Sequence, residues 1–370
     1  MRLSSSINMV VHSSAHCLTS GQTLYAAAPT AKTAHPARLA RLTLLAGLAG
    51  LIGPGVWAQS VPASSTAPSA EAGRVSCQRN LSTPSGACWG EISYPNGNRY
   101  RGPILGQRPV GKGELSYPDG RRYTGDFLDG QATGQGTMNL PNGSVYVGEF
   151  TAGRYNGQGS LTQPNGERYV GEFKDDWFDG EGMLVAANAV RYQGQFRRSL
   201  YNGQGSLQLP NGDRYEGQFK DSQYHGRGDL KNADGQRYVG DFSEGLPHGQ
   251  GLQTFPNGDR YEGEFRAGLQ NGHGVYNFAS GVRYVGQMRA NQFDGQGVLT
   301  LADKTRYVGE FRAGKFNGQG ILTLPTGSRY VGEFVGGVRK GKGKLFDARG
   351  QLVEEGLYED GRLVRALNND

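Results

Sequence analysis

The chain has 370 residues, of which 61 are glycine, 19 tyrosine and 15 phenylalanine, whereas hydrophobic residues make up only 36%. This is too little apolar sequence for a thick globular core, and the aromatic content is too high for a flexible glycine linker. The glycines follow no Gly-X-Y triplet, which excludes collagen. A thin, repetitive β architecture remains, and this composition disfavours an enzyme.

The net charge of +6 does not indicate a nucleic-acid binder. Residues 1–58 contain Arg2, Lys32, Arg38 and Arg41 and no acidic residue, which leaves 35 of the 39 basic residues against 33 acidic ones in the rest of the chain. A nucleic-acid binder normally concentrates positive charge on its folded part. We therefore expect no nucleic-acid partner.

The segment that ends at Ala58 has the pattern of a bacterial-type secretory signal. Arg38 and Arg41 precede an apolar stretch from Leu42 to Ile52, which is followed by the helix-breaking Pro54 and a small-residue end. We expect residues 1–58 to be removed by cleavage after Ala58, and the protein to reside in the periplasm or cell envelope or to be secreted. The apolar stretch is shorter than the roughly 20 residues of a membrane span. An uncleaved signal anchor in the inner membrane is the alternative.

Residues 59–76 are rich in Ser, Ala and Pro and are predicted to form a disordered tether. Cys17 would leave with the signal, so Cys77 and Cys88 remain as an even pair. In an exported chain such a pair predicts one disulfide, and two free thiols are the alternative. Two cysteines with no histidine nearby do not make a metal site.

A repeat of 23 residues extends over residues 91–345. Each unit has a tyrosine, from which positions are counted here, then glycine at +2 and Gly-x-Gly at +11 to +13. Position +4 is Phe in nine units, Ile104 in the first and Met288 in the ninth. The eleven tyrosines are Tyr100, Tyr123, Tyr146, Tyr169, Tyr192, Tyr215, Tyr238, Tyr261, Tyr284, Tyr307 and Tyr330.

A turn such as Pro141-Asn142-Gly143 separates neighbouring units. Proline presets φ for the first turn position, and glycine accepts the left-handed one. The flanking segments alternate in polarity, so each unit is predicted to be a β-hairpin with Tyr, Gly and Phe on one face. A tyrosine ring from a neighbouring strand can lie over a glycine, which has no side chain. Stacked units would thus bury one aromatic and aliphatic face.

The combination of Tyr-x-Gly-x-Phe, Gly-x-Gly and Pro-Asn-Gly at this period resembles the MORN (membrane occupation and recognition nexus) repeat family, here of an exported bacterial type. The resemblance implies an all-β fold, in which an elongated, curved, single-layer antiparallel sheet or solenoid contains about 11–12 stacked hairpins. It also implies protein scaffolding and phospholipid contact. Two turns depart from the pattern, because Ala189 and Lys304 replace the glycine, and these turns are expected to be looser.

Both ends of the array are expected to be capped. Residues 77–90 read as an N-terminal half-repeat, in which Cys88 takes the place of the first glycine of Gly-x-Gly. A Cys77–Cys88 bond would close this edge, which otherwise invites strand pairing. Residues 346–370 read as a degenerate C-terminal repeat followed by a tail.

No pattern in the chain predicts catalysis. His225 and His248 occupy the same place in adjacent units, where other units have Asn, Asp, Thr or Lys, so they are interpreted as solvated loop residues. Acidic residues at +3 recur on the face opposite the aromatics and are interpreted as a solvating ladder. They lie alongside an arginine at position −1, and these arginines are called the Arg row. The Arg row consists of Arg99, Arg122, Arg168, Arg191, Arg214, Arg237, Arg260, Arg283, Arg306 and Arg329.

Evenly spaced aromatic residues at +9 are the predicted partner-binding residues. They are expected near the hairpin loop along one edge of the ribbon, where they could stack on sugar rings or accept apolar side chains. Local packing over neighbouring glycines is the alternative. With Trp177, which adjoins Phe178, the set consists of Tyr155, Trp177, Phe178, Tyr201, Tyr224, Phe293 and Phe316.

The sequence thus predicts a non-enzymatic scaffold or binding protein of the cell envelope, which binds protein partners through an extended β surface. The alternative is an accessory protein that binds phospholipid headgroups or cell-wall glycan. No catalytic residue, cofactor or metal ligand is predicted, because a ribbon of near-identical units offers no single deep pocket.

Overall fold

The computed structural model describes residues 74–78 and 86–367, which form 27 strands and no helix. The all-β fold expected from the sequence is therefore confirmed. The predicted signal, residues 1–58, and residues 59–73 of the predicted tether lie outside the described part of the chain. Within that part, no helix is long and apolar enough to span a membrane.

The described residues divide at Ala233 into two compact units. The N-terminal unit contains β1 (Arg74–Gln78), β2 (Cys88–Ser93), β3 (Arg99–Leu105), β4 (Arg108–Pro109), β5 (Gly111–Ser116), β6 (Arg122–Leu128), β7 (Gln131–Asn139), β8 (Val145–Thr151), β9 (Arg154–Thr162), β10 (Arg168–Lys174), β11 (Trp177–Val185), β12 (Arg191–Arg197), β13 (Leu200–Gln208), β14 (Arg214–Lys220) and β15 (Gln223–Lys231). The C-terminal unit contains β16 (Arg237–Ser243), β17 (Leu246–Thr254), β18 (Arg260–Arg266), β19 (Leu269–Asn277), β20 (Arg283–Arg289), β21 (Gln292–Thr300), β22 (Arg306–Arg312), β23 (Lys315–Thr323), β24 (Arg329–Val335), β25 (Val338–Phe346), β26 (Leu352–Glu359) and β27 (Arg362–Ala366).

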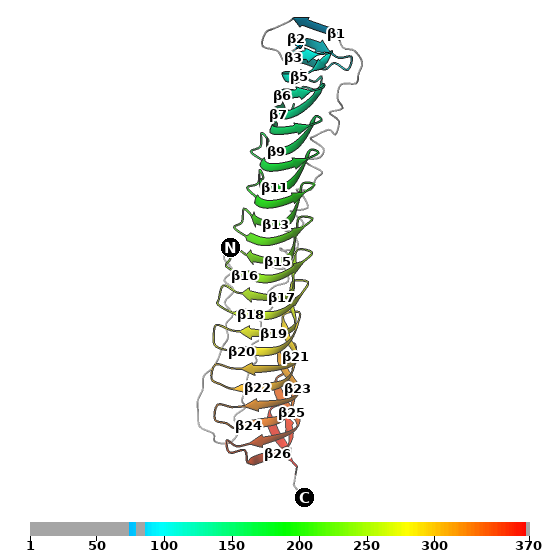
Figure 1. Ribbon diagram of the computed structural model, residues 1–370. Coiled ribbons are helices and arrows are strands. Elements are labelled where there is room, and N and C mark those ends of the chain that lie inside the picture. The colour runs from blue at the N-terminus through cyan, green and yellow to red at the C-terminus, as the bar shows by residue number, and fades with distance from the viewer. Residues whose placement is uncertain (1–73, 79–85, 368–370) are drawn as a thin grey trace. The chain divides into compact units, whose positions relative to one another are not determined.

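Within each unit the strands pair antiparallel in chain order, as Figure 1 shows. The one variation is that β3 pairs with both the two-residue strand β4 and with β5. Each described unit is therefore a single-layer meander of hairpins, as the repeat predicted. Because every pairing is between neighbours in the sequence, each hairpin depends mainly on the units beside it.

Two kinds of turn alternate along the chain. Inside a repeat, β10 and β11 are joined by Asp175 and Asp176, whose φ values of 49° and 71° give the left-handed two-residue turn that suits a hairpin. Between repeats, Gly166 has φ of 86° and donates its N–H to the carbonyl of Gln163 at 3.0 Å. Ala189 and Lys304 keep this hydrogen bond, at 2.9 and 3.0 Å, with φ of 65° and 76°. The two departing turns are therefore not looser, but they hold non-glycine residues in a strained region.

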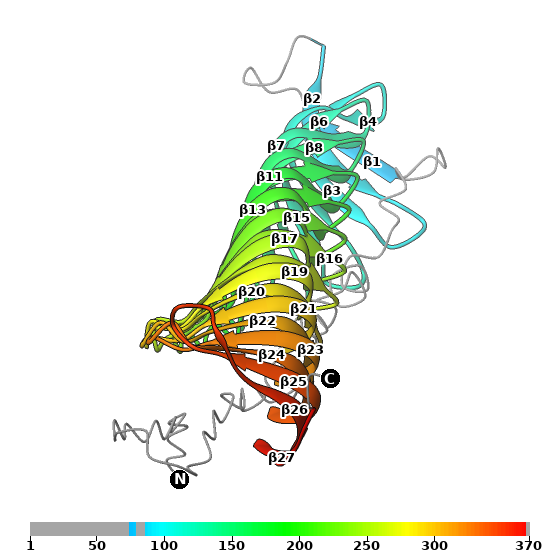
Figure 2. The ribbon, with the colours of Figure 1, turned by 90° about the horizontal axis from the view of Figure 1, so that it is seen from below.

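A bulge bends the first hairpin of each repeat. In the pair β10–β11 the register shifts between Gly171, which pairs with Gly182, and Phe173, which pairs with Phe178. Between these two pairs β11 therefore has more residues than β10. The same shift recurs in the other repeats, for example β12–β13 and β22–β23. A bulge bends its strand and increases the local twist, and the strands in each unit are visibly curved in Figure 2.

The repeat tyrosines form the core on one face of the sheet. Tyr169 is 0% exposed, and its hydroxyl donates to the backbone carbonyl of Glu172 at 2.8 Å. A Cβ added to Gly182 on the adjacent strand would lie 2.4 Å from this hydroxyl, so only glycine leaves room for the ring. Phe173 of the same repeat and Phe196 of the next meet the ring edge-on at 5.0 and 5.1 Å. Each tyrosine thus links two consecutive repeats.

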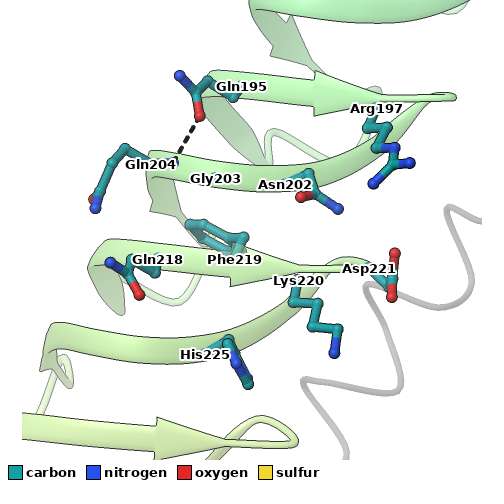
Figure 3. Close-up of a pocket in the computed structure, with 10 residues that line it drawn as sticks. All are labelled: Gln195, Arg197, Asn202, Gly203, Gln204, Gln218, Phe219, Lys220, Asp221 and His225. Atoms are coloured by element: carbon teal, nitrogen blue, oxygen red, sulfur yellow. Dashed lines mark hydrogen bonds between the residues drawn. The ribbon is translucent and has the colours of Figure 1, made fainter.

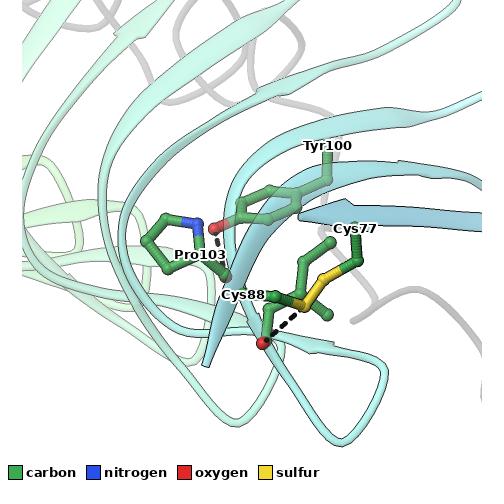
Figure 4. Close-up of a disulfide and its surroundings, with 5 residues drawn as sticks. Cys77, Cys88, Tyr100 and Pro103 are labelled. Carbon is green, nitrogen blue, oxygen red and sulfur yellow. Dashed lines mark hydrogen bonds between the residues drawn. A yellow bond between two sulfur atoms is a disulfide. The ribbon is translucent and has the colours of Figure 1, made fainter. Parts of the chain in front are cut away.

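The N-terminal edge carries the predicted disulfide. Cys77 on β1 and Cys88 on β2 are bonded, with their Cα atoms 5.7 Å apart (Figure 4). Cys88 pairs with Ile104 across β2–β3, as Gly111 pairs with Phe127 one repeat later. The predicted pairing is therefore confirmed, and it ties β1 to β2, which pairs with β3 of the first full repeat.

Loss of this bond is expected to loosen the first repeats. Cys88→Ser opens a loop of 11 residues in sequence separation, and closing a loop of that size stabilises by roughly 2–3 kcal/mol. Hydrogen exchange should therefore accelerate in β2–β5 but hardly change in β13–β15, because coupling is between neighbours. Ser93→Ala, a substitution at an exposed position of the same strand, is the matched control. Unaltered exchange in β2–β5 would contradict a stabilising role.

Candidate binding surfaces

The structure corrects the prediction that the +9 aromatics lie open on a ribbon edge. The two-residue turn places Phe178 directly opposite Phe173, so position +9 faces the core. Each of these rings stacks on the tyrosine of its own repeat at 3.7–3.8 Å between centroids. They are therefore buried packing residues. Their stacking partners are the repeat tyrosines and not the neighbouring glycines that the alternative interpretation expected. Exposed fractions of 3–8% are found for Tyr155, Phe178, Tyr201, Tyr224, Phe293 and Phe316.

Trp177 differs from the rest of this set. It lies on the opposite face, across from Lys174, and is half-buried. Of the seven predicted residues it is thus the one that retains access to solvent.

The +3 residues have a role that sequence reasoning missed. The Glu149 carboxylate accepts the backbone N–H of Gln158 at 3.1 Å, where the bulge leaves an amide outside the strand ladder. Gln195 makes the same contact with Gln204 at 3.2 Å, through its side-chain carbonyl oxygen. The interchange of Glu, Asp and Gln at this position was the available signal, because these side chains share an acceptor oxygen and not a charge. The +3 residues are therefore structural acceptors as well as solvating groups.

This role predicts different outcomes for two substitutions of one residue. Glu149→Ala removes the acceptor and is expected to lower the free energy of unfolding by about 1 kcal/mol. Glu149→Gln keeps an acceptor oxygen and is expected to remain close to wild type. Thermal melts and the exchange rate of the Gln158 amide measure both variants. Equal destabilisation by the two would show that charge, and not hydrogen bonding, matters here.

The Arg row lies on the solvent face, and all ten of its residues are exposed. Several of these residues contact neighbouring side chains, and Arg329, for example, lies over the Phe346 ring at 4.8 Å. Arg122 lies 3.7 Å from the Glu114 carboxylate, and Arg168 donates to the Ser160 hydroxyl at 3.4 Å. Exposed pairs of this kind contribute little to stability. The row is thus a surface of accessible guanidinium groups.

A shallow groove of about 380 Å³ opens on the solvent face over β12–β15 (Figure 3). Amide side chains line one part of it, including Gln195, whose oxygen accepts the N–H of Gln204. Another part is lined by the charged residues Arg197, Lys220 and Asp221 and by His225. The groove offers hydrogen-bond donors and acceptors but no pairing of a nucleophile with a base. It is suited to polar contact with a partner.

The three histidines in the described residues have separate surroundings. His225 lines the groove, His248 is exposed, and the His273 Nδ1 lies 3.8 Å from the Glu264 carboxylate. Over residues 74–78 and 86–367 there is no group of three or more His, Cys, Asp and Glu side chains that could hold a metal ion.

Burial raises the pKa of the core tyrosines. The pKa of Tyr330 and Tyr358 rises to about 12, and that of Tyr169 and the tyrosines around it rises further, chiefly because of desolvation. Nearby carboxylates add to the effect, as Glu172 does for Tyr169. These phenols stay protonated at neutral pH, so their hydroxyls serve as hydrogen-bond donors and not as acid–base groups.

Comparison with known proteins identifies the repeat. A family model described as the MORN repeat matches eleven segments, which are residues 108–121, 123–145, 146–168, 169–188, 192–214, 215–237, 238–260, 261–283, 284–306, 307–329 and 330–351. A comparison with curated proteins found no match.

Several solved structures resemble the chain distantly. The TCP10 domain of Danio rerio CPAP in complex with a STIL peptide is 13% identical, with a TM-score of 0.21, and the alignment covers 72% of this chain and 98% of that one. The Drosophila melanogaster SAS-4 TCP domain in complex with a proline-rich motif of Ana2 is 15% identical, with a TM-score of 0.26 and coverage of 56% and 99%. At such scores these likenesses carry no inference about function.

Proposed function

The chain belongs to the MORN repeat family, and we propose from this premise that it is a non-enzymatic scaffold that binds protein partners through the solvent face of its sheet. One observation carries the proposal. The core positions are nearly constant, whereas the outward position +14 changes from Ser160 to Met183, Ser206 and Asp229 in four consecutive repeats. All four are exposed or half-buried. Because the fold does not dictate these residues, their variation is available for recognition.

Site-specific photo-crosslinking in the native cells tests the proposal. A photoreactive residue at Met183, which is 45% exposed, should trap a protein partner. The same residue at Leu184, which is buried in the core, is the matched control and should trap none. Adducts confined to lipid, or no adduct from any outward position of β9, β11 and β13, would overturn a scaffold role.

The exposed Arg row favours a second candidate function, the binding of anionic phospholipid headgroups. Guanidinium groups recognise phosphate in a bidentate manner. Binding of this kind should weaken steeply between about 0.05 and about 0.5 M salt, because exposed charges are screened. Sedimentation with anionic vesicles over that range separates it from apolar protein contact. Stacking on cell-wall glycan loses its support, because the +9 rings that were expected to provide it are buried.

We further propose that the protein acts in the cell envelope. The signal pattern that ends at Ala58 supports export, and the Cys77–Cys88 bond supports an oxidising compartment. The exported chain should begin at Gln59, which amino-terminal sequencing of the envelope fraction would detect. Recovery of exported protein with residues 1–40 intact would contradict cleavage.

A further inference from the structure

An apolar stripe crosses six consecutive strands on the solvent face of the C-terminal unit. Its residues alternate between positions +1 and +14, and each lies directly opposite the next across the strand pairs of β19–β24. Ile321 is 40% exposed and the others are half-buried. The apolar stripe consists of Val275, Val285, Val298, Val308, Ile321 and Val331.

The fold does not require apolar residues in this column. In the N-terminal unit, Gln193, Ser206, Glu216 and Asp229 succeed one another at the same positions across β12–β15. A charged residue follows the stripe at each end. At one end Glu262 lies opposite Val275 and separates the stripe from Leu252 and Val239, which continue the same column. At the other end Lys344 follows Val331 and is paired with Glu355 at 3.0 Å.

We propose that this stripe is covered by the same stripe of a second copy of the chain. A sheet with one apolar face is stabilised when a second layer covers it. Side chains in the stripe follow the strand spacing of about 4.8 Å, so its length is about 24 Å. A second copy has the same spacing, so the side chains around the centre of the stripe meet apolar partners even at the crossing angle of about 30° that packed sheets adopt. A helix has a pitch of about 5.4 Å, so its side chains would not match the strand spacing along the stripe.

The Arg row determines the orientation of this dimer. Arg283, Arg306 and Arg329 flank the stripe on one side, at position −1 of the strands that carry Val285, Val308 and Val331. If the two stripes ran in opposite directions across a two-fold axis, the two Arg rows would face each other and repel. A two-fold axis along the stripe places the rows on opposite sides. The charges therefore favour this second arrangement, in which the two stripes run in the same direction.

Sedimentation analysis of the purified full chain tests the proposal. Wild-type protein should pass from monomer to dimer between about 1 and about 200 µM, because a stripe of this length buries less area than a standard interface. The double variant Val298→Lys/Val308→Lys should weaken dimerisation by at least about tenfold, because it places like charges in the contact. Lysine is compatible with the fold at this column, as Lys344 shows. The melting temperature should therefore stay close to wild type.

The matched control is Ser206→Lys, which adds one charge to the same column in the N-terminal unit and should leave dimerisation unchanged. A wild-type chain that stays monomeric throughout the range would overturn the proposal, as would equal dimerisation of the double variant. Binding of monomeric wild type to neutral vesicles, lost in the double variant, would assign the stripe to a lipid surface instead. None of these results depends on whether a protein partner is found by crosslinking.

Discussion

The triple variant Tyr169→Ala/Tyr192→Ala/Tyr215→Ala is expected to unfold the repeats of the N-terminal unit around β10–β15. Each of these rings is at most 1% exposed and lies over glycines that have no side chain to replace it. Removing a buried aromatic ring destabilises by about 3–5 kcal/mol, and a domain has only about 5–15 kcal/mol in total. The summed loss of stability from three consecutive repeats therefore exceeds the stabilisation that neighbouring repeats supply. Circular dichroism and thermal melts measure the effect.

The matched variant Phe178→Ala/Tyr201→Ala/Tyr224→Ala is also expected to be destabilised, but less than the core-tyrosine variant. Its three rings stack on the core tyrosines at 3.7–3.8 Å, so their loss exposes those tyrosines. Other repeats tolerate Ala132 or Gln270 at this position. A core-tyrosine variant that melts like wild type would contradict the assignment of the core face.

The periodicities of the sequence were sufficient to predict the hairpins and their core face. Alternation places Tyr146, Gly148 and Phe150 on one side of β8, and the 23-residue period repeats that side along the chain. The side taken by the +9 residue could not be predicted in the same way, because it depends on the length of the turn before it. That turn has no Asn-Gly or Pro-Gly signal in several repeats, for example Arg198-Ser199. With two residues in the turn, +9 pairs with +4 and must face inward.

The bulge is the second structural feature that the sequence pattern did not predict. A bulge shifts the register after +2, and alternation alone does not reveal it. Its sign in the sequence is the glycine at +11, such as Gly180, which has φ of 73° and where an added Cβ would clash with the Glu172 carboxylate from +3. The sequence shows that this glycine is constant but does not show which side chain faces it. The solvent-face column at +1 and +14 cannot be predicted either, because neighbours across strands depend on the register.

Raising the pH above about 10 is expected to unfold the protein cooperatively. The pKa of each core tyrosine is raised in the folded state above the ordinary value of 10.0, and reaches about 12 for Tyr330. The stabilising effect is therefore complete below pH 10 and is lost as the pH rises through the folded-state values. Each tyrosine that must stay protonated lowers the free energy of unfolding by about 1.4 kcal/mol per pH unit above 10. With one such tyrosine in every repeat, the loss accumulates along the array.

Two single substitutions separate the hydrogen bond of a tyrosine from its ionisation. Tyr192→Phe keeps the ring but loses the hydrogen bond to the Gln195 carbonyl at 2.8 Å, so it should lower stability at neutral pH by about 1 kcal/mol. The Tyr201 hydroxyl is buried and has no hydrogen-bond partner among the described residues. Tyr201→Phe should therefore raise the melting temperature at neutral pH, and Phe178 already occupies the same place one repeat earlier.

Both variants should nevertheless lose stability less steeply than wild type above pH 10, since each removes one phenol that must stay protonated in the fold. Tyrosinate absorbance and circular dichroism, followed together during an alkaline titration, measure this slope. In wild type the two signals should change at the same pH, because the buried phenols ionise only when the repeats open. If tyrosinate formed near pH 10 while the circular dichroism stayed native, the phenols would be accessible in the fold, and burial would not control their ionisation.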